Sequence, residues 1–281
     1  MGEFSLLSLN IFGIPFFLGW ERLRRLARVL DRSTATVICL QEVQQHAYTS
    51  MIQRNLPSYP YHFSERHIYA PKGGLAMYSR LPLVGPRFEV YQERGVFLSI
   101  GYSDYALYKG ILSACFEVGE QTIIVLTTHL NANYGGVWHP TNPLALLERY
   151  QVKQLVRAIH ACPEEALVIA CGDLNFPRNS FLYEELVTQN NLLDPLANDP
   201  RPSYRPFPLV PAKWNVSLDY VLVRQPLQKN FQIRGDVVEI SDSAKKFSIQ
   251  RFLTDHNALT LHVSWDDSPD PKGEQGEQTQ D

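Results

Sequence analysis

The sequence lacks any apolar run that could span a membrane, and it has no excess of basic charge. A membrane-spanning helix needs about 20 predominantly apolar residues in a row, a length that no apolar run of this chain reaches. The net charge of −3 at pH 7 argues against binding that depends on neutralising many phosphates. A nucleic-acid enzyme stays open, because a metal ion can supply positive charge locally.

The sequence is also poor in the signatures of zinc proteins and serine hydrolases. Its four cysteines, at positions 39, 115, 162 and 171, have no metal-ligand spacing. The Gly-x-Ser-x-Gly motif of a nucleophilic serine is absent. Three of the cysteines lie in apolar runs, so we predict buried free thiols, which fit a reducing compartment.

The apolar residues 4–20 are not predicted to be a signal peptide. Glu3 precedes them, no Lys or Arg opens the stretch, and Asn10, Gly13 and Pro15 interrupt it. We interpret the stretch as a strand followed by an apolar loop. The expectation is a monomer that is cytoplasmic or peripheral to a membrane.

Short apolar runs bounded by Gly, Pro and polar residues predict an α+β fold. With 281 residues, 44% of them hydrophobic, the chain can bury a sizeable core. The expected strands span residues 4–10, 36–42, 73–79, 109–116, 122–129, 168–171, 217–223 and 257–263, and the expected helices span 20–30, 49–56 and 142–161. Many strands with few helices predict two packed, mostly antiparallel sheets flanked by helices. We expect one domain, residues 1–265, and a disordered polar tail, residues 266–281.

The stretch Val168–Pro177 combines a predicted buried strand with two polar residues, Asp173 and Asn175. Positions two apart on a strand share a face, so this carboxylate and amide could meet the same metal ion or phosphate oxygen. The alternative is an Asx-rich turn after the strand. The stretch alone does not decide between them.

Polar residues recur at the ends of the predicted strands. They are Asn10, Glu42, His129, Asp173, Asn175, Asp219, Asp255 and His256. For any one of these residues, a purely structural role is the more common explanation. Together, however, they predict one acidic pocket with two histidines at a rim of the sandwich. Carboxylate and amide oxygens favour a hard cation, and open positions for phosphate oxygens favour Mg²⁺. Histidines beside such a site fit phosphodiester hydrolysis, where one group helps a water attack and another stabilises the developing charge.

Six short motifs, in this order and spacing, resemble those of the endonuclease/exonuclease/phosphatase superfamily. They are Leu9-Asn10, Gln41-Glu42, Thr128-His129-Leu130-Asn131, Gly172-Asp173-Leu174-Asn175, Leu218-Asp219-Tyr220 and Thr254-Asp255-His256. The resemblance covers nearly the whole chain. It implies a four-layered α/β sandwich and Mg²⁺-dependent phosphoester cleavage by activated water, with Mn²⁺ as a substitute. It further implies that Glu42 is the main metal ligand, with Asn10 beside it and Asp255 as a neighbouring metal-linked carboxylate.

The same resemblance implies catalytic roles for the remaining residues of the set. His256 is expected to be the general base, oriented by Asp219. Asp173 and Asn175 are expected to handle the attacking water and the phosphate. His129 is expected to stabilise the transition-state phosphate or the leaving oxygen.

Several segments resemble the neutral sphingomyelinase branch of this superfamily. They are Asn10-Ile-Phe-Gly-Ile-Pro15 with the arginine-rich helix after it, residues 72–80, Tyr108-Lys-Gly110, and residues 128–134 running into a long helix. This resemblance implies a phospholipase C-type enzyme that splits sphingomyelin or a related phosphocholine lipid into ceramide and phosphocholine. The C-terminal hydrophobic helices of membrane-bound members and the signal peptide of secreted bacterial members are missing, which leaves the route to a lipid open.

Two alternative functions stay open on the same fold. One is a nuclease or a phosphatase, although the inositol phosphatase pattern is not met, because Tyr220 rather than Arg follows Asp219. The other is a non-catalytic binding module, which the intact polar set argues against. A lipid could be reached through peripheral membrane contact of the apolar residues Ile14 to Leu18; the alternative is that they pack against Leu23.

Overall fold

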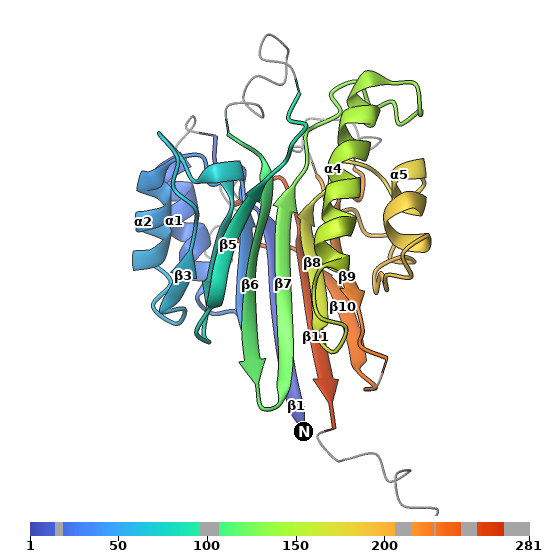
Figure 1. Ribbon diagram of the computed structural model, residues 1–281. Helices are drawn as coiled ribbons and strands as arrows, with labels where there is room; N and C mark the ends of the chain where they lie inside the picture. The colour runs from blue at the N-terminus through green and yellow to red at the C-terminus, as the bar shows by residue number, and fades with distance from the viewer. Residues whose placement is uncertain (15–18, 96–106, 206–214, 228, 243–251, 267–281) are drawn as a thin grey trace, which may run out of the picture.

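Two sheets pack face to face with helices on both outer sides (Figure 1), as the α+β prediction required. The computed structural model describes residues 1–14, 19–95, 107–205, 215–227, 229–242 and 252–266. The six-stranded sheet has the order β10-β11-β1-β2-β4-β3 and the five-stranded sheet has the order β5-β6-β7-β8-β9. Figure 1 shows α1 and α2 on one side of the sandwich and α4 and α5 on the other.

The elements have the following bounds. The first sheet comprises β1 (Gly2–Asn10), β2 (Val37–Gln41), β3 (Tyr61–Phe63), β4 (Ala76–Ser79), β10 (Gln232–Val238) and β11 (Ala258–Trp265). The second comprises β5 (Val84–Val90), β6 (Gly110–Val118), β7 (Gln121–His129), β8 (Leu167–Asp173) and β9 (Asp219–Arg224). The helices are α1 (Gly19–Leu30), α2 (His46–Arg54), α4 (Pro143–His160) and the short α5 (Phe181–Tyr183), which continues into a π-helical turn, Glu184–Thr188.

One parallel strand pair in each sheet sets the position of the polar residues. β1 pairs parallel with β2, and β7 pairs parallel with β8, whereas the other strand pairs are antiparallel. Each parallel pair is joined by a crossover helix, α1 or α4. The carboxyl ends of both pairs therefore carry their last residues to the same rim, where Asn10 lies opposite Gln41 and His129 lies opposite Asp173.

Three apolar clusters hold these layers together. The central cluster fills the space between the sheets, where the rings of Phe4 and Phe116 lie 5.6 Å apart. A second cluster lies between the first sheet and α1 and α2, and a third lies between the second sheet and α4 and α5. The predicted apolar stripe of α1 is buried apart from Trp20, which is 49% exposed.

The structure differs from the predicted elements mainly at sheet edges. The strands β3, β5 and β10 were not predicted, and all three are edge strands. In β5 and β10 exposed and half-buried residues alternate, so they carry little apolar signal. The strand expected from Gly73 begins at Ala76, because Lys72–Gly74 form a 3₁₀ turn in which Gly73 has φ of 65°.

Two predicted segments lie outside the described residues. These are residues 15–18 of the apolar loop and residues 267–281 of the polar tail. Among the described helices, none combines the length and the apolar character that crossing a membrane requires.

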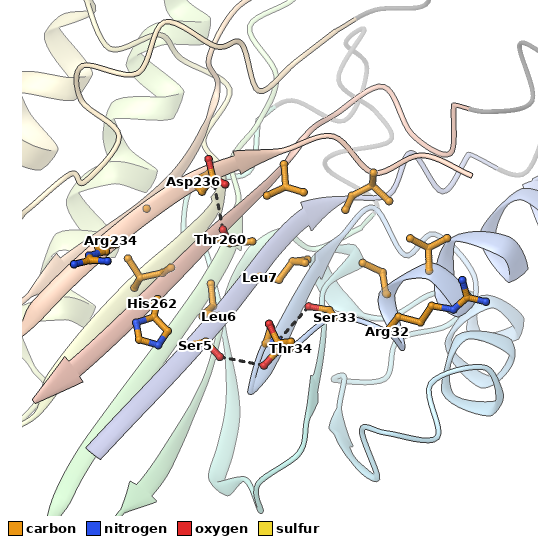
Figure 2. A pocket seen from close by; sticks show the side chains of 17 residues that line it. Ser5, Leu6, Leu7, Arg32, Ser33, Thr34, Arg234, Asp236, Thr260 and His262 are labelled. Carbon is orange, nitrogen blue, oxygen red and sulfur yellow. Dashed lines mark hydrogen bonds between the residues drawn. The ribbon is translucent and has the colours of Figure 1, made fainter. Parts of the chain in front are cut away.

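A groove of about 590 Å³ lies on the outer face of the first sheet (Figure 2), and none of the eight polar residues predicted at strand ends lines it. It runs between β10, β11 and β1 and the end of α1. Leu7, Leu30 and Val238 form part of its apolar floor, and Arg234 and His262 stand on its exposed side. This mixture is typical of an antiparallel sheet with one face turned to solvent.

Gly172, directly before Asp173, should be intolerant of any side chain. Its φ is 137°, and an added Cβ would lie 1.9 Å from the carbonyl oxygen of Thr128 on β7. We expect Gly172→Ala to lower the free energy of unfolding by about 3 kcal/mol or more, measured by urea denaturation. The control is Gly119→Ala in the hairpin turn, where φ is 61° but the space is open, so only about 1 kcal/mol of backbone strain is expected. Equal losses in the two variants would show that close approach of the strands is not what requires Gly172.

Candidate active site

The eight polar residues predicted at strand ends form one connected group at the rim of the sandwich. Asn10 and Glu42 come from the first sheet, and His129, Asp173, Asn175 and Asp219 come from the second. Asp255 and His256 lie just before β11, which begins at Ala258. Segments 240 residues apart in the sequence meet here, since the Thr254 hydroxyl donates to the main-chain carbonyl of Asn10 at 2.7 Å, at a sequence separation of 244.

Asn10 links the two sheets through its side-chain amide. The Nδ2 atom donates to Glu42 Oε1 and to Asp173 Oδ2, each at 3.0 Å. The Oδ1 atom accepts the main-chain N–H of Phe12 at 3.0 Å. Because a carbonyl oxygen has two lone pairs, Oδ1 keeps one that can bind another group.

Glu42 is held in a strained backbone conformation just beyond β2. Its φ is 61°, which costs a residue with a side chain roughly 1–2 kcal/mol. Gly13 packs so closely that an added Cβ would lie 1.9 Å from the Glu42 carbonyl oxygen. Strain of this kind concentrates at functional sites, where the surrounding structure holds it in place. Here it turns the Glu42 carboxylate towards Asn10.

The Glu42 carboxylate has the surroundings of a cation ligand. Its Oε2 atom is buried and has no hydrogen-bond partner among the described residues. Burial raises the pKa of Glu42, the Asn10 amide opposes this shift, and the nearby negative charge of Asp255 adds to it. A buried anionic oxygen without a partner is costly unless a positive charge offsets it, so the residues present fit a hard divalent cation held by oxygen atoms.

A second group of potential ligands is engaged in hydrogen bonding instead. Atoms of Asp173, Asp219 and His256 lie within 4.8 Å of one another, and none of these residues belongs to the predicted ligand set. His256 Nδ1 already donates to Asp219 Oδ2 at 2.8 Å. That bond uses one potential ligand atom of His256 and one of Asp219, whereas Glu42 Oε2 has no partner among the described residues.

Asp173, the last residue of β8, lies between the two histidines. Its Oδ2 atom is 3.7 Å from His129 Nε2 and 3.7 Å from His256 Nε2. Both distances exceed a direct hydrogen bond. Burial and the charge of Asp219 raise the pKa of Asp173 to about 7. This carboxyl group can therefore exchange a proton near neutral pH.

The two histidines have opposite charge preferences. Burial lowers the pKa of His256, but the charge and hydrogen bond of Asp219 outweigh burial and raise it to about 10. Burial, Lys109 and His256 hold the pKa of His129 well below its usual range. Without a metal ion, His256 is thus an imidazolium and His129 a neutral imidazole at pH 7. Pairs of titratable groups whose pKa values are shifted in opposite directions are typical of sites that carry out acid–base chemistry.

Asn175 reaches the site from a turn and not from a strand. β8 ends at Asp173, and Asn175 has φ of 58°. Its main-chain N–H donates to Asp173 Oδ1 at 3.0 Å, which makes an Asx turn. Its Nδ2 atom donates to the Leu130 carbonyl at 2.9 Å. The same-face strand argument was therefore wrong, although the two side chains do lie at the same site.

Three residues at the site were not assigned a role from the sequence. The buried Lys109 donates from Nζ to the Leu130 carbonyl at 2.6 Å. Arg22, on α1, donates to the main-chain carbonyls of Ile11, Phe12 and Leu253. The Tyr204 ring lies 5.0 Å from the His256 ring. Lys109 stood in a quoted motif, whereas no sequence pattern marked Arg22 or Tyr204.

Comparison with known proteins gives a consistent picture of the family. A model of the Endonuclease/Exonuclease/phosphatase family matches residues 7–256. The chain is 26% identical over 199 residues to the "Putative neutral sphingomyelinase" of Drosophila melanogaster, covering 70% of this chain and 45% of that protein. It is 30% identical over 196 residues to the inositol phosphosphingolipids phospholipase C of Schizosaccharomyces pombe, covering 68% and 45%. The chain spans less than half the length of either relative.

Solved structures share the fold over almost the whole chain. Sphingomyelinase C from Streptomyces griseocarneus has a TM-score of 0.72 at 19% identity, covering 93% of this chain and 99% of that one. A beta toxin mutant from Staphylococcus aureus with bound magnesium ions has 0.71 at 18%, covering 92% and 99%. D. rerio TDP2 complexed with a single-strand DNA product has 0.69 at 18%, covering 93% and 99%. These likenesses confirm the four-layered α/β sandwich.

The paired His256 and Asp219 should be visible in a proton titration. In the metal-free protein, the His256 ring signals in NMR spectra should titrate near pH 10, and Asp219→Asn should lower this pKa because the carboxylate that outweighs burial is gone. Since the folded pKa lies above the ordinary 6.5, the pair stabilises the fold fully below about pH 6.5. This contribution is lost as pH rises through about 10. The same titration range for His256 in both proteins would contradict the pairing.

Proposed function

The chain belongs to the endonuclease/exonuclease/phosphatase family, and we propose that it is a phosphodiesterase of phospholipase C type that hydrolyses sphingomyelin or a related phosphocholine lipid. Members of the family are hydrolases that act on phosphodiester bonds and depend on a divalent metal ion. The observation that carries the proposal is the buried Asp173 carboxyl group between two imidazoles of unlike charge, beside the unpaired Glu42 oxygen.

In this proposal, Glu42, Asn10 and Asp255 hold the metal ion. Glu42 provides the unpaired Oε2 atom, Asn10 the free lone pair of Oδ1, and Asp255 a second, half-buried carboxylate. A divalent cation there would polarise a phosphate oxygen and would offset the negative charges that hold the proton on His256.

His256 would then act as the general base in the attack of water on phosphorus. Its Nδ1–H bond to Asp219 fixes the tautomer, so Nε2 is the atom that accepts the proton of the water. Asp173 and Asn175 orient the water and the phosphate, and the neutral His129 donates a hydrogen bond to the phosphate or the leaving oxygen. The 3.7 Å separations around Asp173 Oδ2 leave the histidines unpaired with it and free for these contacts.

A lipid substrate is favoured over a nucleic acid by the curated relatives and by the charge of the chain. Both relatives are named for enzymes of sphingolipids, and the net charge is −3. A nuclease is the second candidate, because the fold is shared with TDP2 complexed with a DNA product. An inositol-containing head group is the third, supported by the yeast relative.

A substrate panel tests the proposal directly. The protein with Mg²⁺ would be given vesicles of sphingomyelin, vesicles of inositol phosphosphingolipid, single-stranded DNA with a 5′-phosphodiester adduct, and soluble inositol phosphates. We expect release of phosphocholine at the highest kcat/KM. Preference for the DNA substrate or for the inositol lipid would overturn the choice of substrate while leaving the phosphodiesterase activity established.

Glu42 should be required for binding of the metal ion. Glu42→Gln keeps the shape of the side chain but weakens a hard-cation ligand, so Mg²⁺ affinity by calorimetry should fall about 10-fold to 100-fold, and turnover at limiting Mg²⁺ should fall with it. The control is Glu21→Gln, which removes an exposed carboxylate paired with Arg24 at 2.8 Å. Unchanged Mg²⁺ affinity in Glu42→Gln would rule out this assignment.

We also propose that residues 14–18 make the peripheral membrane contact. Burial of a phenylalanine side chain contributes on the order of 1.5–3 kcal/mol, so two phenylalanines can decide whether the protein binds a vesicle. The double variant Phe16→Ser, Phe17→Ser should lose vesicle binding in sedimentation and activity on bilayers, but keep its rate on a soluble phosphocholine ester. Equal losses on both substrates would mean that these residues serve the fold instead.

A further inference from the structure

Helix α4 buries a stripe of three polar side chains against the second sheet. Glu148, Gln151 and Gln154 recur every three residues and are all buried. Gln154 donates to Glu89 Oε1 at 2.6 Å and to the Val90 carbonyl at 3.0 Å. Gln151, one turn closer to the site, donates to Asn131 Oδ1 at 2.5 Å and accepts the Asn131 main-chain N–H at 3.0 Å. The two glutamines are thus fully engaged in fastening neighbouring segments.

Glu148, at the end of the stripe nearest the catalytic rim, is different. The residue is 0% exposed, and neither carboxyl oxygen has a hydrogen-bond partner among the described residues. The side chains of Asn133 and Trp138 lie close enough to the Glu148 carboxyl group to oppose the rise of its pKa by hydrogen bonding, yet Asn133 Oδ1 and Trp138 Nε1 are buried and make no hydrogen bond of ordinary geometry. Four unpaired polar atoms from three neighbouring side chains therefore gather at one place.

The number of donors and acceptors in this group matches only one protonation state of Glu148. An ionised carboxylate has no donor. Its two oxygen atoms could then accept from Trp138 Nε1 and from the second N–H of Asn133 Nδ2, whose first N–H donates to the Val137 carbonyl, but Asn133 Oδ1 would be left without a donor. A neutral carboxylic acid has one O–H donor and one carbonyl acceptor. The Trp138 N–H can then pair with the Glu148 carbonyl oxygen, and the Glu148 O–H can pair with Asn133 Oδ1. The protonated acid satisfies all of these groups.

We propose that Glu148 is held as a neutral carboxylic acid and is a positioning residue, which fastens the segment between β7 and α4 beneath the catalytic rim. This segment begins at Leu130, whose carbonyl accepts from both Lys109 Nζ and Asn175 Nδ2. It continues through Asn131, which Gln151 already holds. Gln151 holds Asn131 by hydrogen bonds. In the same way, Glu148, one turn closer to the N-terminus of α4, holds Asn133 and Trp138.

The charges around Glu148 favour the neutral form at pH 7. Burial raises the pKa of Glu148 to about 9, and the charge of Asp173, at the end of β8, adds to this shift. Lys109, directly before β6, and the two neighbouring side chains oppose it. An ionised Glu148 would attract the ammonium group of Lys109 away from the Leu130 carbonyl. Deprotonation of Glu148 should therefore disturb Asn175, which donates to the Leu130 carbonyl, and His129, which precedes Leu130 in the chain.

The protonation state can be measured without any enzymatic activity. Infrared difference spectra between the wild-type protein and Glu148→Gln, both loaded with Mg²⁺ at pH 7, should show the carbonyl stretch of a protonated carboxyl group that the variant lacks. This band should disappear from the wild type as pH rises through about 9. The difference spectrum between the wild type and Glu164→Gln, a change at an exposed position, should show no such band. A carboxylate signal assigned to Glu148 at pH 7 would overturn the proposal.

The positioning role is tested by activity, and only this readout rests on the proposed function. Glu148→Leu removes the donor and the acceptor, so kcat should fall about 10-fold to 100-fold with little change in KM, as for a displaced catalytic group. Glu148→Gln supplies both a donor and an acceptor, so it should restore most of kcat and should not lose activity near pH 9 as the wild type does. Should Glu148→Gln lose as much kcat as Glu148→Leu, or keep the alkaline loss, the proposal is wrong. If the wild type is inactive on sphingomyelin, the infrared result stands and the same comparison is made on the preferred substrate of the panel.

Discussion

The carboxylates of Glu42 and Asp173 stand at the ends of strands in different sheets, and the side-chain amide of Asn10 holds them close together. Asn10 Nδ2 lies 3.0 Å from Glu42 and 3.0 Å from Asp173. Two anions in a low-dielectric environment repel each other and lose their hydration, so the arrangement depends on neighbours that donate hydrogen bonds or carry positive charge. The amide supplies part of this stabilisation in the free protein. In the proposed function, a divalent cation at the oxygen of Glu42 that the amide leaves unpaired would supply the rest.

The same constraint explains the unlike behaviour of the two histidines. Both are buried, and burial disfavours the charged form of each. His256 has Asp219 at 2.8 Å and two further carboxylates near it, whereas His129 has the cations Lys109 and His256 as neighbours. The carboxylates thus concentrate positive charge on one side of Asp173. In the proposed function, the binding of a metal ion and the readiness of His256 to accept a proton would be coupled through these charges.

The backbone around the rim is shaped to permit this crowding. Glu42 and Asn175 both adopt positive φ, and Gly172 approaches Thr128 more closely than any side chain would permit. Arg22 ties the segments after β1 to Leu253 through main-chain carbonyls. Buried polar groups of α4, from Gln154 to Glu148, hold the second sheet and the segment after β7 from the opposite side. The site is therefore rigid because each of its segments is fixed by hydrogen bonds outside the site.

The sequence alone determined the α+β fold, the central strands and the set of polar residues at their ends. Apolar runs mark strands that are buried on both faces, and polar residues recur where these runs end, so Asn10 and Asp173 could be placed at a rim without coordinates. The edge strands β3, β5 and β10 escaped detection because half-exposed strands carry weak apolar patterns. Only the tertiary structure decided the left-handed backbone of Glu42, the turn that carries Asn175, the clamp made by Arg22 and the unpaired carboxyl of Glu148. It also decided which histidine is charged. Hydrogen bonds and pKa values depend on all the neighbours of a group, and here these neighbours come from segments that are far apart in the sequence. No local sequence pattern contains this information.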